Sequence, residues 1–249
     1  MTPYTSLEAE LHDLFWEDEE TPEQAWLDAL LTEFPGRALE VGCGSGRLLL
    51  PLLEKGHTVE GLDPSPDMLM LCREKAGGLQ PVLHEATMAN FRSNSPYRSI
   101  LIPSFTLQLS SDPVADLRHL RGMLTDDGVL YLTVFRPFAE LDGELPEDEW
   151  YLDHEADLPG GGRATLHTRH HLDRGNHVLH REHRYRLDKD GAIREHRSEQ
   201  SIRWFEPGPL AGMLDDAGFE IDRACADFDE AEPVTDEAQI ITLIARLRR

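Results

Sequence analysis

A ten-residue run constrains the fold of this chain more than any other feature. Residues 38–47 read Ala-Leu-Glu-Val-Gly-Cys-Gly-Ser-Gly-Arg, an apolar strand pattern that leads into glycines at 42, 44 and 46. Glycine takes positive φ angles and carries no Cβ that would block a ligand. The helix expected after the turn offers unpaired N–H groups at its positive end. The run therefore predicts a strand, a turn and a helix start that suit a nucleoside ligand.

The next segments extend this unit to a βαβα pattern. Residues 47–55 have helical apolar spacing that Pro51 interrupts, and 57–63 predict a second strand. Pro64-Ser65-Pro66 then predicts the start of a helix over 67–76. In such folds an acidic side chain at the carboxyl end of the second strand accepts hydrogen bonds from the ribose hydroxyls, and Asp63 stands there. A plain turn residue is the alternative interpretation of Asp63.

The glycine spacing distinguishes two kinds of nucleotide site. A dinucleotide site reads G-x-G-x-x-G, whereas the third glycine here comes one residue earlier, which disfavours a nicotinamide-dependent dehydrogenase. The run resembles the first motif of the class I S-adenosylmethionine-dependent methyltransferases, E-x-G-x-G-x-G, at Glu40, Gly42, Gly44 and Gly46. The resemblance covers residues 37–135 well and the C-terminal strands loosely. It implies an enzyme with S-adenosyl-L-methionine as its cofactor.

The segment after the predicted third strand, 80–85, departs from the family pattern. Residues 86–91 occupy the place of a G-D-M-x-D-F motif, but Thr87 replaces the usual aspartate while Met88 and Phe91 fit. The Met88 backbone N–H can still recognise adenine, and Thr87 can replace the carboxylate weakly.

The fourth predicted strand, 99–102, ends in a segment that bears on the substrate. It continues as Pro-Ser-Phe rather than the P-P-Y of enzymes that methylate amino groups of DNA bases, so such chemistry is disfavoured. Arg98 stands where the family often has an acid. Because ligands bind at the carboxyl ends of parallel strands, Pro103 and Phe105 are site candidates. The cofactor residues that we expect are Glu40, Gly42, Cys43, Gly44, Gly46, Asp63, Pro64, Met68, Thr87, Met88 and Pro103.

The remaining core pattern completes a sheet that is covered on both faces. A helix over 113–124 precedes the near-continuous apolar run 129–135, which is typical of a central strand. A helix at 209–217 and strands that begin at 219 and 239 follow. The resemblance implies an α/β, Rossmann-like sheet of seven strands in the order 3-2-1-4-5-7-6, with the last strand antiparallel. We expect one methyltransferase domain over 1–249, with N-terminal helices at 1–35, the core at 36–137 and 206–249, and an insertion at 138–205.

The N-terminal segment predicts two helices. Apolar residues at 7, 11, 14 and 15 have helical spacing, 17–20 read as a solvated break, and Thr21 with Gln24 forms a capping box for the second helix. In this family such helices often cover the cofactor, so Tyr4, Phe15 and Trp16 are candidates to line the site. Ordinary packing is the alternative.

The insertion combines an acidic segment with a β-rich one. Residues 138–162 hold many carboxylates and no Lys or Arg, which predicts a solvated loop, and they lack the spacing of a calcium loop. The runs 164–172, 177–187 and 192–205, separated by turn-rich breaks, predict a three-stranded antiparallel meander that serves as a lid or a dimer surface.

The meander contains seven of the twelve histidines and is locally basic. As a lid it would hold an anionic small molecule while a histidine accepts a proton, with Tyr4, Phe105, Arg169 and His170 as substrate candidates. Polar cross-strand pairs on a wet sheet face explain the same residues. Zinc is disfavoured because no carboxylate or thiolate accompanies the histidines at a known spacing.

The overall charge and the lack of targeting signals limit the partners. A formal net charge of −23 disfavours a nucleic-acid substrate. No apolar stretch approaches about 20 residues, and 1–20 lack a signal-peptide pattern, so we expect no membrane partner and a cytoplasmic location. The three cysteines have no zinc spacing and predict no disulfide framework.

The pattern as a whole predicts a function but no catalytic residue. Methyl transfer from a sulfonium neutralises charge, so a catalytic base is optional and the protein mainly aligns the reactants. We expect a monomer or homodimer that methylates the N or O of a small molecule. The alternative is a non-catalytic S-adenosylmethionine-binding protein, or one whose partner subunit completes the site.

Overall fold

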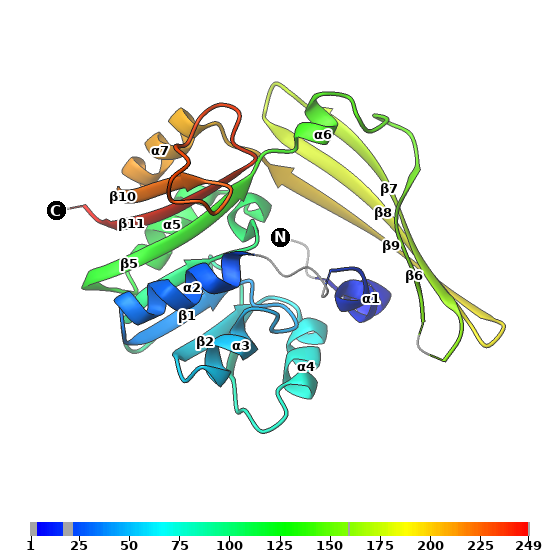
Figure 1. The fold of residues 1–249 in the computed structure, drawn as a ribbon, viewed down its shortest axis with the longest axis horizontal. Helices are drawn as coiled ribbons and strands as arrows, with labels where there is room; N and C mark the ends of the chain where they lie inside the picture. The colour runs from blue at the N-terminus through cyan, green and yellow to red at the C-terminus, as the bar shows by residue number, and fades with distance from the viewer. Residues whose placement is uncertain (1–3, 17–21, 159, 249) are drawn as a thin grey trace. The chain divides into compact units, whose positions relative to one another are not determined.

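Seven strands form one sheet in the computed structural model of this chain, which describes residues 4–16, 22–158 and 160–248 (Figure 1). The strand order is β10-β11-β5-β4-β1-β2-β3. β1 pairs in parallel with β2 and β4, whereas β11 runs antiparallel to both β5 and β10. The strands are β1 (Arg37–Val41), β2 (Thr58–Asp63), β3 (Val82–Glu85), β4 (Tyr97–Ile102), β5 (Leu124–Phe135), β10 (Phe219–Ala226) and β11 (Ile240–Leu247). This confirms the predicted order and the reversed last strand.

Helices cover both faces of this sheet. Successive strand residues point to opposite sides, so neighbouring residues of β1 pack against different helices. Ala38 of β1 packs with the leucines of α2 (Pro22–Glu33), α3 (Leu49–Glu54) and α4 (Pro66–Lys75). Its neighbour Leu39 belongs to the core under α5 (Pro113–Arg121) and α7 (Pro207–Asp216). Pro51 is tolerated because it lies in the first turn of α3, where a backbone N–H has no helical partner. A short 3-10 helix, η1, spans Thr106–Leu109.

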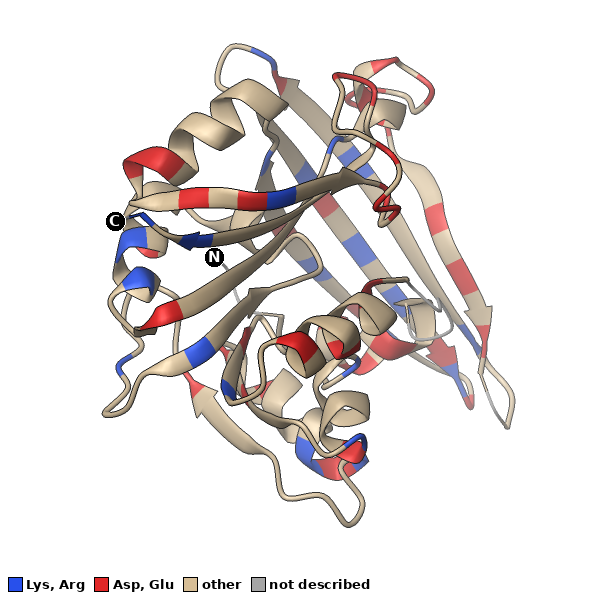
Figure 2. Cartoon of the chain, turned by 60° about the vertical axis from the view of Figure 1, so that its left-hand side comes forward, with Lys and Arg blue, Asp and Glu red and all other residues tan. Residues whose placement is uncertain are grey.

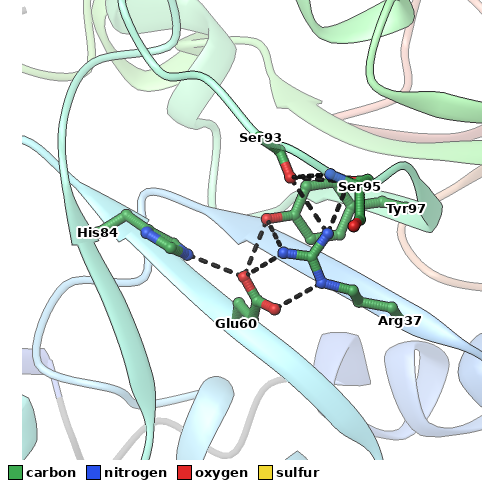
Figure 3. A network of polar contacts seen from close by, with 6 residues as sticks. All are labelled: Arg37, Glu60, His84, Ser93, Ser95 and Tyr97. Carbon is green, nitrogen blue, oxygen red and sulfur yellow. Dashed lines mark hydrogen bonds and ion pairs between the residues drawn. The ribbon is translucent and has the colours of Figure 1, made fainter.

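A polar network ties four parallel strands together (Figure 3). The guanidinium of Arg37 donates to both carboxylate oxygens of Glu60, Nε to Oε1 at 2.6 Å and Nη2 to Oε2 at 2.8 Å. Tyr97 donates its hydroxyl to the same carboxylate at 2.9 Å, and His84 Nε2 lies 2.8 Å from it. These partners hold the pKa of Glu60 below its usual value despite burial. One carboxylate thus receives groups from β1, β3 and β4.

The chain divides into two compact units, and the sheet above belongs to the one that draws on 21–136 and 205–249. The other, from 1–20 and 137–204, contains an antiparallel sheet in the order β6-β7-β8-β9. These strands are β6 (Tyr151–Asp157), β7 (Arg163–Asp173), β8 (Val178–Lys189) and β9 (Ala192–Arg203). The same unit holds α1 (Ser6–Trp16) and α6 (Phe138–Leu141).

The predicted three-stranded meander is wrong by one strand, and the solvated loop over 138–162 is wrong in part. β6 and α6 both come from that acidic segment. β6 is an edge strand, so its exposed carboxylates do not prevent pairing, and Glu155 forms an ion pair with Arg163 of β7. The many carboxylates of this segment led to the prediction of a loop. The segment is a strand, and alternate residues such as Ala156 pair with buried positions of β7.

α1 packs on the four-stranded sheet. Leu7 and Leu11 join a buried cluster with Leu166 and Tyr185. The rings of Phe15 and Trp16 lie 5.8 and 4.2 Å from that of His154 on β6. These contacts are those of ordinary packing, the alternative considered for Phe15 and Trp16. The proposed cap at Thr21 and the break at 17–20 lie outside the described residues.

Candidate functional site

The turn between β1 and α3 needs glycine at each of its three glycine positions. Gly42, Gly44 and Gly46 have φ angles of +76°, +52° and +89°. A Cβ on Gly42 would lie 2.5 Å from Thr106 Oγ1, and one on Gly46 would lie 2.7 Å from Cys72 Sγ. At these two positions the missing Cβ therefore makes room for the protein's own packing. At Gly44 the nearest atom is the Met68 methyl carbon, 3.1 Å away.

Asp63 lies against this turn at the carboxyl end of β2. Its Oδ2 accepts the Gly44 N–H at 3.0 Å and its Oδ1 accepts the Ser65 N–H at 2.8 Å. Ser65 caps α4 by accepting the Met68 N–H at 3.1 Å, and Met68 is buried. Pro64 lies between Asp63 and Ser65 in the sequence. The predicted residues Asp63, Pro64 and Met68 therefore lie at the end of β2, in the turn that follows it and in the first turn of α4.

Glu40 is a buried carboxyl group with an unsatisfied oxygen. It is 2% exposed, and Oε2 has no hydrogen-bond partner among the described residues. Burial raises the pKa of Glu40 to about 8, while the nearby Arg47 acts in the opposite direction. A buried oxygen without a partner is costly, so this position suits a ligand group that carries N–H donors or positive charge.

Cys43 contributes packing rather than thiol chemistry. Its side chain is buried, and a Cβ on Gly61 of β2 would come within 2.6 Å of Cys43 Sγ. Burial raises the pKa of the Cys43 thiol well above its usual value, which keeps it protonated. Any ligand contact at position 43 would therefore come from the backbone.

The loop after β3 is closed by a residue that the sequence did not single out. Asn90 Oδ1 accepts the Thr87 N–H at 2.7 Å, and the Phe91 N–H donates to the Thr87 carbonyl at 3.0 Å. The side chains of Met88 and Phe91 are buried in the core. Asn90 stands where the family's G-D-M-x-D-F motif has its second aspartate. Alignment with that motif could therefore have identified Asn90. An amide oxygen there still accepts a backbone N–H.

The turn after β4 is strained and held by a buried carboxylate. Ser104 and Phe105 have φ angles of +51° and +64°, which side chains other than glycine rarely adopt. Glu23 of α2, 2% exposed, accepts the Ser104 N–H at 3.2 and 3.3 Å and the Thr133 hydroxyl at 2.8 Å. The Phe105 ring packs against Phe135 at 4.8 Å. Acidic residues are common in the first turn of helices, so no sequence signal distinguished Glu23.

Polar contacts join the glycine turn to this strained turn. Arg47 Nη2 donates to Ser104 Oγ at 2.7 Å, and Ser104 Oγ in turn donates to Glu23 at 3.2 Å. Pro103 lies at the start of the same turn. Hydrogen bonds thus link the turns at the carboxyl ends of β1, β2 and β4, which carry Gly42, Gly44, Gly46, Asp63, Pro103 and Phe105. Thr87 and Met88 lie in the loop after β3.

The other predicted substrate residues lie in the unit with the four-stranded sheet. Tyr4 accepts a hydrogen bond from Gln200 Nε2 at 3.1 Å, and His170 is buried. Arg169 points to the opposite face of β7, where it forms an ion pair with Glu182 and lies 5.3 Å from the Trp150 ring. Adjacent strand residues face opposite sides, so Arg169 and His170 are not brought together.

Most of the basic character of β6–β9 is neutralised locally. Figure 2 shows basic and acidic positions interspersed along these strands. The ion pairs are Arg163–Glu155, Arg169–Glu182, Arg174–Glu147, Arg181–Glu140, Arg186–Glu195 and Arg194–Glu10. They match the structural interpretation of these six arginines.

One group in this unit has the spacing of a metal site. Ligand atoms of Glu147, Asp148 and His171 lie within 4.8 Å of one another. Glu147 already accepts the Leu172 N–H at 2.9 Å and bonds Arg174 at 3.0 Å. Asp148 and His171 are exposed, and exposed groups of this kind are common in proteins without a bound metal. The arrangement is therefore explained by its own hydrogen bonds and ion pairs.

Among the residues that the structure describes, no helix is both long enough and apolar enough to cross a membrane.

Comparison with known proteins places this geometry in a family. A family described as "Methyltransferase domain" matches residues 15–224. The chain is 27% identical over 218 residues to the putative methyltransferase YqeM of Bacillus subtilis strain 168, covering 84% of this chain and 83% of that protein.

Two solved structures share the fold. The CcbJ methyltransferase of Streptomyces caelestis has a TM-score of 0.80 at 22% identity and covers 100% of this chain and 99% of its own. CalS10 of Micromonospora echinaspora, an amino pentose methyltransferase solved with S-adenosylmethionine bound, has a TM-score of 0.68 at 18% identity and covers 99% of both chains. The chain therefore belongs to the methyltransferase domain family, which confirms the resemblance to the class I S-adenosylmethionine-dependent methyltransferases and, with it, the predicted enzyme class and cofactor.

Proposed function

We propose that this methyltransferase transfers the methyl group of S-adenosylmethionine to the N or O of a small molecule. The observation that carries the proposal is the pairing of the glycine turn with Asp63 beside the unsatisfied oxygen of Glu40. When bound, the cofactor supplies an electrophilic methyl group on a sulfonium. Every other contribution comes from this chain's own side chains and backbone.

The residues of the turn fit the parts of this cofactor. The carboxylate of Asp63 suits the two ribose hydroxyls, and Glu40 Oε2 suits the ammonium of the methionine portion. The Met88 backbone N–H is the proposed contact for adenine. Glu40, Gly42, Cys43, Gly44, Gly46, Pro64, Met68, Thr87 and Pro103 complete the proposed cofactor residues.

Two observations support a small-molecule acceptor. The chain carries a net charge of −23, which opposes a nucleic-acid substrate. Its fold is that of CalS10, which acts on an amino pentose.

The proposal is tested by cofactor binding to Asp63→Ala. The loss of charge-assisted ribose bonds should weaken S-adenosylmethionine binding by about 1 to 3 kcal/mol in calorimetry. Glu74→Ala, which removes an exposed carboxylate from α4, is the matched control and should leave the dissociation constant unchanged. Equal affinity of wild type and Asp63→Ala would refute the role of Asp63.

Turnover separates the enzyme from a binding protein. A methyl-transfer assay over amines, alcohols and carboxylic acids, with S-adenosylhomocysteine release as the readout, should find activity with at least one amine or alcohol. Tight cofactor binding with no turnover on any acceptor would favour the non-catalytic alternative. Preferential binding of NADH would contradict the proposal as a whole.

A further inference from the structure

Three buried side-chain nitrogens on two neighbouring strands lack hydrogen-bond partners among the described residues. His170 of β7 is 1% exposed, and neither of its ring nitrogens is bonded within the described part of the chain. Arg181 stands opposite it in the β7–β8 register, and its buried Nε is likewise without a partner among those residues. A buried imidazole that bonds nothing costs free energy, which native proteins recover through a ligand or water.

The polar groups around this pair are already satisfied. Glu140 of α6, itself buried, forms an ion pair with the Arg181 guanidinium. Further along the same face, Thr168 donates to Asp153 at 2.6 Å and bonds His183 Nδ1 at 3.0 Å. On this face of the sheet, the buried side-chain atoms of the described residues that lack a hydrogen-bond partner are the two nitrogens of His170 and Arg181 Nε.

The charge of this spot is balanced. Burial lowers the pKa of His170, so its imidazole is neutral near pH 7. Glu140 compensates the positive charge of Arg181. The Tyr151 ring lies edge-on at 6.1 Å and adds an apolar wall.

The hydrogen-bond inventory selects a class of ligand. A neutral imidazole offers one donor and one acceptor, and Arg181 Nε offers one donor. A hydroxyl or neutral amine can both donate and accept, so two such neighbouring groups satisfy all three atoms. A carboxylate or phosphate has no donor for the imidazole acceptor and would face the carboxylate of Glu140.

We propose that His170 and Arg181 form a binding site for a neutral ligand with adjacent hydroxyl or amine groups, as in a sugar or polyol. The proposed site lies wholly within the unit that contains the four-stranded sheet. Arg169, on the opposite sheet face, has no part in it.

The test uses methyl α-D-glucopyranoside as the neutral probe and acetate as the anionic one. In the full-length protein with ¹⁵N-labelled histidine, the glucoside should shift the ring resonances of His170 saturably, while acetate should not. His170→Gln identifies those resonances by their loss and should weaken glucoside binding about tenfold in calorimetry. His167→Gln is the control, because it replaces a histidine on the other face of the same strand. It should bind the glucoside as wild type does.

A second variant guards against misfolding. Arg181→Lys keeps the positive charge that pairs with Glu140 but removes the Nε donor, so it should fold with an unchanged melting temperature and bind the glucoside several-fold more weakly. A response to acetate alone, no response to either probe, or unchanged binding by His170→Gln would each overturn the proposal. S-adenosylmethionine binding, measured on the same samples, tests the proposed function separately, because cofactor binding without a glucoside response contradicts only the site at His170.

Discussion

At the scale of single residues, two buried glutamates have opposite relations to their surroundings. Glu23 is fully engaged by Ser104 and Thr133, whereas Glu40 has an unsatisfied oxygen. The first stabilises a strained turn, and the second is the proposed contact for the ligand ammonium. The same residue type is satisfied at one position and unsatisfied at the other because the local donors differ.

Glu40 should make cofactor affinity depend on pH. Burial raises its pKa from 4.5 to about 8, so the carboxyl group is largely protonated in the free protein below that value. A ligand ammonium pairs with the ionised form, so affinity for S-adenosylmethionine should rise as the pH increases from about 6 towards 8. Calorimetry should also detect proton release on binding.

Glu40→Gln is the matched variant, because its amide cannot ionise. Its affinity for the cofactor should be flat over the same pH range. A wild-type affinity that falls as pH rises towards 8 would show that Glu40 does not meet a cationic group.

Glu23 should affect stability. Glu23→Ala leaves the Ser104 N–H and the Thr133 hydroxyl without their acceptor in a buried turn and should lower the free energy of unfolding by about 1 to 3 kcal/mol. Urea unfolding measures this change. Glu33→Ala, at the exposed end of the same helix, removes only a surface ion pair with Arg223 and should cost about 1 kcal/mol or less. Equal costs would mean that the buried network adds no stability.

At the scale of elements, the sheet is held by the Arg37–Glu60 network of Figure 3 as well as by its backbone bonds. Glu60→Ala removes the shared acceptor, so the Tyr97 hydroxyl loses the group to which it donates. The Arg37 guanidinium then keeps only its bonds to Ser93, Ser95 and Tyr97. The loss of a partner in such a network should destabilise the protein by about 3 kcal/mol. Asp222→Ala, which breaks the more exposed pair with Arg246 at the other end of the sheet, is the control and should cost less than about 1 kcal/mol.

The same network predicts an acid sensitivity. The pKa of Glu60 is lowered in the folded protein, so its contribution to stability is present above the unfolded value of 4.5 and is lost as pH falls through the folded value. The stability difference between wild type and Glu60→Gln should therefore shrink on acidification below 4.5. A difference that stays constant to low pH would argue that the carboxylate charge is unimportant.

At the scale of the whole molecule, the excess of acidic groups should make stability depend on salt. A net charge of −23 produces self-repulsion in the folded state, which screening reduces. The melting temperature should rise when sodium chloride increases from about 0.01 M to about 0.15 M, as the Debye length falls from about 30 to about 8 Å. Sucrose at matched osmolality is the control for non-ionic effects. A fall in melting temperature would show that screening of the ion pairs of β6–β9 outweighs the repulsion.

Much of the architecture followed from local patterns in the sequence. The apolar run at 129–135, the glycine turn at 42–46 and Asp63 at a strand end each have a backbone or burial requirement that only a few residue types meet. The family resemblance then supplied the strand order, which the structure confirms. β6 was missed because an edge strand with charged alternate residues has the composition of a loop.

The sequence by itself determined the fold class, because strand periodicity and glycine conformation are properties of short segments. Its resemblance to the methyltransferase family implied the methyl donor. Only the tertiary structure decided which polar groups have partners. It placed Glu23 beneath the strained turn at Ser104, 81 residues away, and separated Arg169 from His170 on opposite faces of one strand. The physical reason is that satisfaction of a buried hydrogen bond depends on groups brought together from distant parts of the chain, and no local pattern records them.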